Sequence, residues 1–205
     1  MGKILGLAGA YVSLRGVQAF AGLADAHTQT AARLERMNDG LQTTAELQDL
    51  IYRSAQRSRG DYQETADMVG KLGTMAGEAF SSNRELVAFA EQLNKQFALA
   101  GTGAQGIQAA MLQLTQAMSS GVLRGEELNS VLEQAPTIAQ TIARHMGVTV
   151  GEMRELASQG RITSQVVKEA LLGAAAETDA AFERVPLTFS QAWTMAGNAA
   201  VKSME

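Results

Sequence analysis

The sequence lacks several residue types that particular folds and sites require. It contains no cysteine, which excludes disulfides, thiol catalysis and thiolate metal sites. It has only two prolines, and no segment alternates apolar and polar residues as a half-buried strand does. Aromatic residues make up 5% of the chain, a low share for a surface that stacks nucleic-acid bases or for a large ligand pocket. The net charge of −4 argues against a basic nucleic-acid or membrane partner.

The residues that are present favour an all-α protein. The chain has 205 residues, of which 46% are hydrophobic, and it is rich in Ala, Leu, Gln and Met. That length suits one domain, or one domain with an extension, and that composition can bury a sizeable core. We therefore predict a compact multi-helix bundle of short helices separated by glycines, with a long N-terminal helix and an incomplete C-terminal helix.

The N-terminal part, residues 1–40, is predicted to be a separate long apolar helix. Residues 4–26 carry a single charge, Arg15, before Asp25, and small residues recur there at spacings of four. About 20 apolar residues can span a membrane, but Arg15 and Gln18 lie in the middle of the segment. The pattern favours a helix packed against protein, in the same chain or in copies of it, with membrane contact as the alternative. We expect residues 1–38 to promote self-association.

Residues 41–185 contain regular helix start and stop signals. Capping boxes are predicted at Thr43–Glu46, Ser82–Glu85 and Thr149–Glu152, with Asp61 as a further N-cap. Helix ends are predicted at Gly60, Gly101, Gly121, Gly147 and Gly160. One longer helix is expected from Thr163 or Ser164 to Val185-Pro186. These signals predict a bundle that folds back on itself.

The segment Leu114–Pro136 is the most informative part of that region. After Gly121, the residues Leu123-Arg124-Gly125 turn the chain, and Glu126-Glu127 place negative charge in the first turn of the next helix. Leu128 lies on the buried face of that helix, and Pro136 opens another one. After residue 186 a further helix begins whose pattern still runs at Glu205, so we expect a longer polypeptide.

No set of residues has the spacing of a catalytic or metal site. His27 and His145 lack a second ligand at a suitable distance in sequence. Glu126, Glu127 and Glu133 are better explained as helix-dipole partners and surface charges than as an acid–base pair. The stretch 101–103 is a linker rather than a phosphate loop, because no strand precedes it. Four methionines lie on apolar stripes and are predicted to fill the core, namely Met111, Met118, Met146 and Met153.

The central segment resembles the N-terminal domain of phage and prophage tail tape measure proteins. The resemblance lies in the strings SGVLRGEELN, EQAP, GVTVGEMR and GRIT, and it covers about Thr43–Ala200. The motif residues are Gln113, Gln116, Gly121, Leu123, Arg124, Gly125, Glu126, Glu127, Leu128, Gln134, Pro136, Gly147, Thr149, Glu152 and Gly160. The resemblance implies that these residues frame the domain and that none is catalytic or binds a cofactor or metal.

The resemblance also implies a function. Tape measure proteins are long helical proteins inside the tail tube that set tail length, so we expect a structural fragment of a virion, prophage or tail-like particle. The expected partners are other tape measure copies, tail-tip or tail-tube proteins and a tail assembly chaperone, without a small-molecule substrate or nucleic acid. The expected location is the interior of the tail, and the host cytoplasm during assembly.

Two other functions fit the residues less well. A general helical protein-binding module needs no more than the predicted bundle. Residues 138–156 also have the outline of a helix-turn-helix DNA-binding motif. The second helix of that motif would present Glu152 and Glu155 beside Arg154 to phosphates, which opposes DNA binding.

Overall fold

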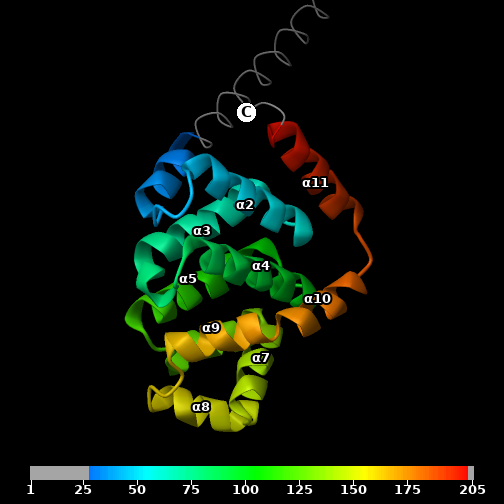
Figure 1. The fold of residues 1–205 in the computed structure, drawn as a ribbon. Coiled ribbons are helices and arrows are strands. Elements are labelled where there is room, and N and C mark those ends of the chain that lie inside the picture. Colours follow the sequence, from blue (N-terminus) through cyan, green and yellow to red (C-terminus); the bar gives the residue numbers. More distant parts are fainter. Residues whose placement is uncertain (1–27, 203–205) are drawn as a thin grey trace, which may run out of the picture.

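The computed structural model describes residues 28–202, and this part of the chain is a helical bundle (Figure 1). It contains no β-strand between residues 28 and 202, which confirms the predicted all-α class. Residues 28–37 are helical. The rest of the predicted N-terminal helix, residues 4–27, lies outside the described residues.

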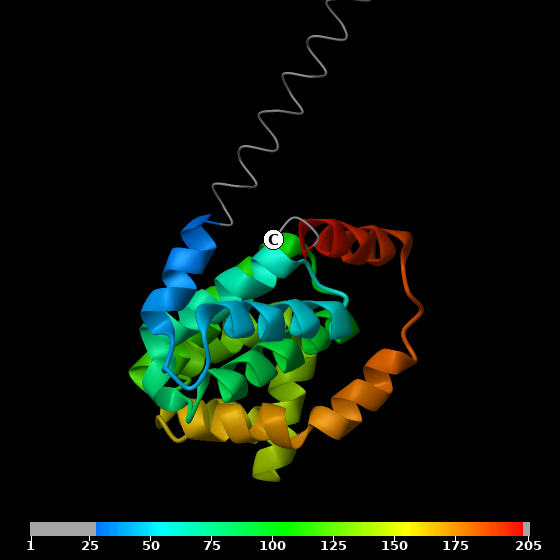
Figure 2. The same cartoon turned by 45° about the horizontal axis from the view of Figure 1, so that its top comes forward.

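The helices follow one another with short connections. Their bounds are α2 Thr44–Arg57, α3 Tyr62–Ala76, the 3₁₀ helix η1 Gly77–Ala79, α4 Asn83–Ala100, α5 Ala104–Ser120 and α6 Gly125–Gln134. The chain continues through α7 Pro136–Met146, α8 Val150–Ser158, α9 Ser164–Gly173, α10 Ala175–Glu183 and α11 Phe189–Lys202. Figures 1 and 2 show α11 at the edge of the bundle, after an extended connection, and it contacts α2.

The central helix α4 organises the core. It contacts α2, α3, α7, α9 and α10. It is buried on several sides: Leu86, Val87, Phe89 and Lys95 point in different directions around the helix and are each at most 4% exposed. The methionine prediction is also confirmed: Met118 and Met153 are buried, while Met111 and Met146 pack partly buried against the core.

The predicted helix starts are confirmed at three of four sites. The Thr43 and Thr149 hydroxyls accept from the backbone N–H groups of Glu46 and Glu152, and each glutamate accepts in return from its threonine N–H. The Asp61 carboxylate accepts from the Glu64 N–H. These bonds occupy N–H groups that a helix leaves free at its start.

The capping box predicted at Ser82 is only half formed. Its hydroxyl accepts from the Glu85 N–H at 3.2 Å. The Glu85 carboxylate, however, accepts from the N–H and hydroxyl of Ser81, at 2.6 and 2.9 Å, and from Lys168 Nζ at 3.3 Å. The reciprocal bond is displaced by one residue because the same carboxylate also pairs with a lysine of α9.

Glycine ends the helices at most of the predicted positions. Gly101, Gly121, Gly147 and Gly160 have φ between 67° and 82°, a region that residues with a Cβ enter only at a cost. The prediction at Gly60 was wrong, because α2 ends at Arg57 and the left-handed residue is Arg59, with φ 54°. A Cβ on Gly60 would lie 3.4 Å from Asn94 Nδ2, which is close to ordinary van der Waals contact, so the space around this position does not require a glycine.

The single helix predicted from Thr163 to Val185 is divided in two. Ala174, with φ −86° and ψ 4°, separates α9 from α10, and the chain bends there (Figure 1). The bend lets both halves bury residues: Val167 and Leu171 of α9, and Thr178 and Phe182 of α10. One straight helix could not keep both sets in contact with the bundle.

Candidate functional site

The two loops that carry the resemblance lie against each other. The loop that follows α5 forms an antiparallel β-bridge with the loop before α9, between Val122 and Thr163. The Leu123 N–H donates to the Ile162 carbonyl and the Ser164 N–H donates to the Gly121 carbonyl, both at 2.8 Å. The strings SGVLRG and GRIT, distant in sequence, therefore form one contact that closes α6, α7 and α8 into a loop.

Apolar side chains anchor this contact in the core. Leu123, Leu128 and Ile162 have no exposed surface. The polar motif residues lie around them at the surface: Arg124, Glu126, Thr149 and Glu152 are exposed. The Arg124 N–H donates to Glu127 Oε2 at 3.1 Å, which fixes the start of α6.

The remaining motif residues also have local structural positions. Three glycines have the left-handed backbone conformation, namely Gly121, Gly147 and Gly160. Helix α6 begins at Gly125 and ends at Gln134, and α7 begins at Pro136. The outer side of α5 carries Gln113 and Gln116. Gln134 also holds the predicted linker 101–103, because the Thr102 hydroxyl donates to its carbonyl at 2.6 Å. Each motif residue thus begins, ends or anchors a helix, apart from the two glutamines of α5.

A cluster of four charged side chains, two of them buried, joins three helices, and the sequence reasoning missed it. Lys95 Nζ donates to Glu91 Oε1 and to Asp179 Oδ1, both at 2.7 Å, and Arg57 donates to Glu91 Oε2 at 2.6 Å. The side chains of Lys95 and Glu91 are 6% and 9% exposed. The Glu91–Lys95 spacing of four residues within one helix was the available signal. This cluster holds α10 and α2 to the central helix.

The surroundings of this charge cluster perturb the acid–base behaviour of two members. Burial raises the pKa of Asp179, but hydrogen bonds from Lys95 and Gln92 outweigh that effect and leave the pKa below its ordinary value. The hydrogen bond to Glu91 raises the pKa of Arg57. Asp179 and Arg57 therefore stay ionised near neutral pH, and the geometry of the cluster is that of a structural clamp between helices.

The helix-turn-helix outline is present in α7 and α8, but its outer surface is of mixed charge. Arg154 lies there between the exposed Glu152 and Glu155. Glu152 is engaged in the cap of Thr149, and Glu155 accepts from Gln159 at 2.8 Å. Nothing in this surface forms the basic strip that phosphate binding needs.

Within residues 28–202, no group of three or more His, Asp or Glu side chains could hold a metal ion. His145 faces Glu169 at 4.0 Å near the end of α7, and His27 lies outside the described residues. None of the helices in the described part of the chain is long and apolar enough to cross a membrane.

A shallow groove of about 470 Å³ lies between residues 28–37 and α3. It is lined by Arg33, Arg36, Lys71 and by the glycines of α3. Arg33 is committed to Asp67 at 2.8 Å, and the Met37 side chain lies over Gly73. The glycines let the first described helix approach α3 closely, so the groove is mainly a consequence of that packing.

The fold and these contacts define a structural helical module, in which motif residues shape the bundle. A family model described as tape measure protein matches residues 18–205. Since the match covers most of the chain, the chain belongs to the tape measure protein family and has a structural role in a phage tail. No curated protein and no solved structure matches it.

Proposed function

We propose that this chain belongs to the part of a tape measure protein that supports tail assembly, in a protein that also sets tail length. The family match supports a structural role in a phage tail. The observation that carries the assembly role is the β-bridge between Val122 and Thr163, which brings distant residues together. A ruler works by length, and an extended helix contributes about 1.5 Å per residue. The length that a folded-back segment adds is set by its packing and does not grow with the number of its residues.

The proposed division has three parts. Residues 1–40 serve packing or oligomerisation, residues 41–185 form the assembly module, and residues 186–205 begin a further helical part. The proposed partners are other tape measure copies, tail-tip or tail-tube proteins and an assembly chaperone. Binding takes place in the host cytoplasm during assembly and persists in the tail interior. The exposed helix faces around the motif contact supply the binding surface, and no small molecule or nucleic acid is needed.

The test uses the complete tape measure gene in its phage. Leu128→Asp places a charge on a side chain with no exposed surface, at a cost of several kcal/mol. We expect few or misassembled tails, with normal length among those that form. Asn129→Asp, on the exposed neighbour, is the matched control and should assemble normally.

An in-frame deletion of residues 149–160 separates the module from a ruler. It removes α8 and leaves the bridge without one of its glycine turns. If this segment belongs to a folded assembly module, few or no tails should form, and electron microscopy counts them. Normal numbers of tails, each shorter by about 18 Å for twelve residues at helical rise, would make this segment part of the ruler.

A further inference from the structure

Arg59, in the turn between α2 and α3, has a backbone conformation that its residue type rarely adopts. Its φ is 54°, the one positive value at a residue other than glycine within residues 28–202. The Gly60 N–H donates to the Ala55 carbonyl at 2.9 Å and the Arg59 N–H donates to the Gln56 carbonyl at 3.2 Å. This is the pattern of a helix end whose left-handed residue is usually glycine. An arginine at such a position indicates that its side chain offsets the cost.

The side chain of Arg59 holds the end of α10. Its Nη1 donates to the Val185 carbonyl at 2.7 Å, and its guanidinium carbon lies 4.5 Å from the centre of the Phe182 ring. Phe182 is 3% exposed, and a cation–π contact gains strength where water is excluded. Because α10 ends at Glu183, these two contacts fix the point at which the chain leaves the bundle toward α11.

The same turn also holds α11. The Asn198 side chain is buried, donates to the Gly60 carbonyl at 2.8 Å and accepts from the Tyr62 N–H at 2.9 Å. We call residues 58–62 the α2–α3 turn and residues 184–202 the C-terminal arm. The α2–α3 turn therefore contacts the arm at two places, near its start through Arg59 and near its end through Asn198.

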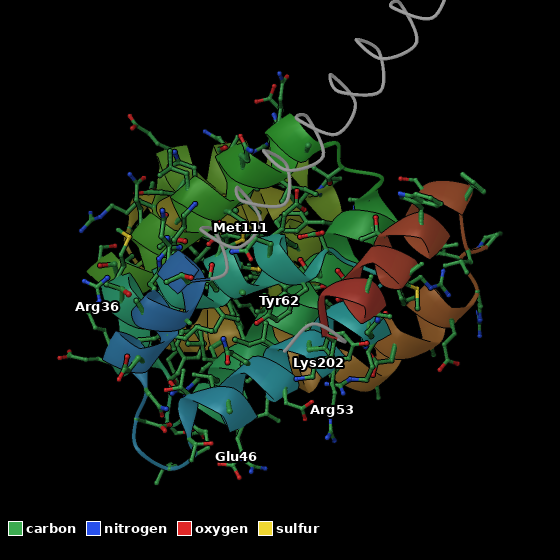
Figure 3. All side chains as sticks on the ribbon, turned by 90° about the horizontal axis from the view of Figure 1, so that it is seen from above. Arg36, Glu46, Arg53, Tyr62, Met111 and Lys202 are labelled. Carbon is green, nitrogen blue, oxygen red and sulfur yellow. The ribbon has the colours of Figure 1, made fainter. Side chains whose placement is uncertain are left out.

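The arm has few apolar contacts with the bundle. Residues 186–188 of the connection are exposed, and Asn198 is the one buried side chain among those described in α11. Lys202 Nζ lies 3.8 Å from Asp49 Oδ1 of α2, at the end of the molecule that Figure 3 shows from above. Burial of apolar surface is the main source of stability in a fold. We therefore expect the arm to open at a lower free energy than the core.

We propose that the C-terminal arm is hinged at residues 184–188 and swings away as a unit while the bundle stays folded, and that Arg59 anchors it in the docked position. Arg59 is a positioning residue, because it sets the direction in which the connection leaves α10. The docked arm gives α11 one orientation, and the released arm gives it several. The proposal rests on contacts within the chain and is independent of tail assembly.

Two substitutions at Arg59 separate the role of its side chain from that of its backbone. Arg59→Gly and Arg59→Ala both remove the guanidinium, but only glycine takes the left-handed conformation without cost. By hydrogen exchange of the purified full-length chain, we expect the α11 amides to exchange about five- to tenfold faster in both variants, while those of α4 stay unchanged. The thermal midpoint of the bundle should be lower for Arg59→Ala than for Arg59→Gly.

Arg161→Gly is the matched control. It removes an exposed arginine that follows the left-handed Gly160, and it should leave the exchange of α11 unchanged. The position of the arm is measured directly with two spin labels, since the chain contains no native cysteine. Ala45→Cys on α2 and Ser190→Cys on α11 are exposed attachment sites. We expect one narrow distance in the native background and an added longer, broader population with Arg59→Gly.

Two results would overturn the proposal. Unchanged distances and unchanged exchange of α11 in Arg59→Gly would show that this side chain does not hold the arm. Equal acceleration of exchange in α4 and α11 would show that the arm and the bundle open together. Circular dichroism of each variant verifies that the helices are retained.

Discussion

At the scale of single residues, the backbone conformation at a glycine decides the stability cost of replacing it more than the space around it does. Gly121 and Gly125 flank the motif loop, and a Cβ on either would meet no atom within 4 Å. Only Gly121 has a positive φ, of 82°. We expect Gly121→Ala to cost about 1 kcal/mol of unfolding free energy, because alanine is disfavoured there. Urea unfolding followed by circular dichroism measures it.

Gly125→Ala is the matched control for that experiment. Gly125 is the first residue of α6, where alanine is the better helix former. The unfolding free energy of the Gly125→Ala variant should equal that of the native chain or exceed it by a few tenths of a kcal/mol. Equal losses in both variants would mean that crowding or loop packing, and not the left-handed conformation, decides the choice of glycine.

A second prediction at this scale concerns Asp179 and pH. The pKa of Asp179 is lowered in the folded chain. The charged carboxylate therefore stabilises the fold at pH values above the unfolded pKa, and this stabilisation is lost as the pH falls through the folded pKa. Asp179→Asn should cost about 1 kcal/mol at pH 7, a modest value because this carboxylate is 45% exposed. The difference from the native chain should shrink below about pH 4.

Unfolding midpoints measured between pH 7 and 3 provide the readout. Glu133→Gln, on the exposed side of α6, is the control and should follow the native curve throughout. A stability difference for Asp179→Asn that stays constant across this range would show that Asp179 acts through packing and not through its charge.

At the scale of elements, α11 is attached through a few polar contacts, and the buried Asn198 makes two of them. Asn198 makes two hydrogen bonds to the turn between α2 and α3, and each is worth about 1 kcal/mol. Asn198→Ala should therefore accelerate hydrogen exchange in α11 while the amides of α4 keep their protection, because the core lies elsewhere. Ser190→Ala, at an exposed position of the same helix, should leave the exchange of α11 unchanged.

The elements also show what sequence reasoning can and cannot reach. Starts at Thr43 and Thr149 and stops at Gly121 and Gly147 were predictable, because the chemistry of a helix end lies within four residues. The break at Ala174 directly follows Gly173, but a glycine inside a helical pattern does not by itself show that the helix ends there; in the folded chain α10 packs against α4. The pairing of Gly121 with Ser164 depends in the same way on contacts between segments far apart in sequence.

The candidate site was predictable only residue by residue. The motif strings identified the family, but the sequence did not place SGVLRG against GRIT, and it missed the cluster around Lys95. In that cluster Asp179 comes from a helix that is distant in sequence. Long-range partners of this kind depend on the folded arrangement of the helices, which local patterns do not contain.

At the scale of the whole molecule, the difference between a module and a ruler is a difference in size. A compact chain of 205 residues has a radius of gyration of about 17 Å. The same chain as one continuous helix would be about 300 Å long, with a radius of gyration of about 90 Å. Small-angle X-ray scattering of the monomeric fraction separates these values without ambiguity. We expect a value near the compact limit, because the bridge and the buried charges tie distant helices together.

The same measurement reports on the N-terminal segment. Because residues 1–38 are expected to promote self-association, the scattering mass of the full chain should rise above that of one chain as the concentration increases. A chain without residues 1–38 should stay monomeric, and the same monomer mass for both chains would contradict this prediction. A radius above about 40 Å in a monomer would contradict the module itself, since no compact fold of this length reaches that size.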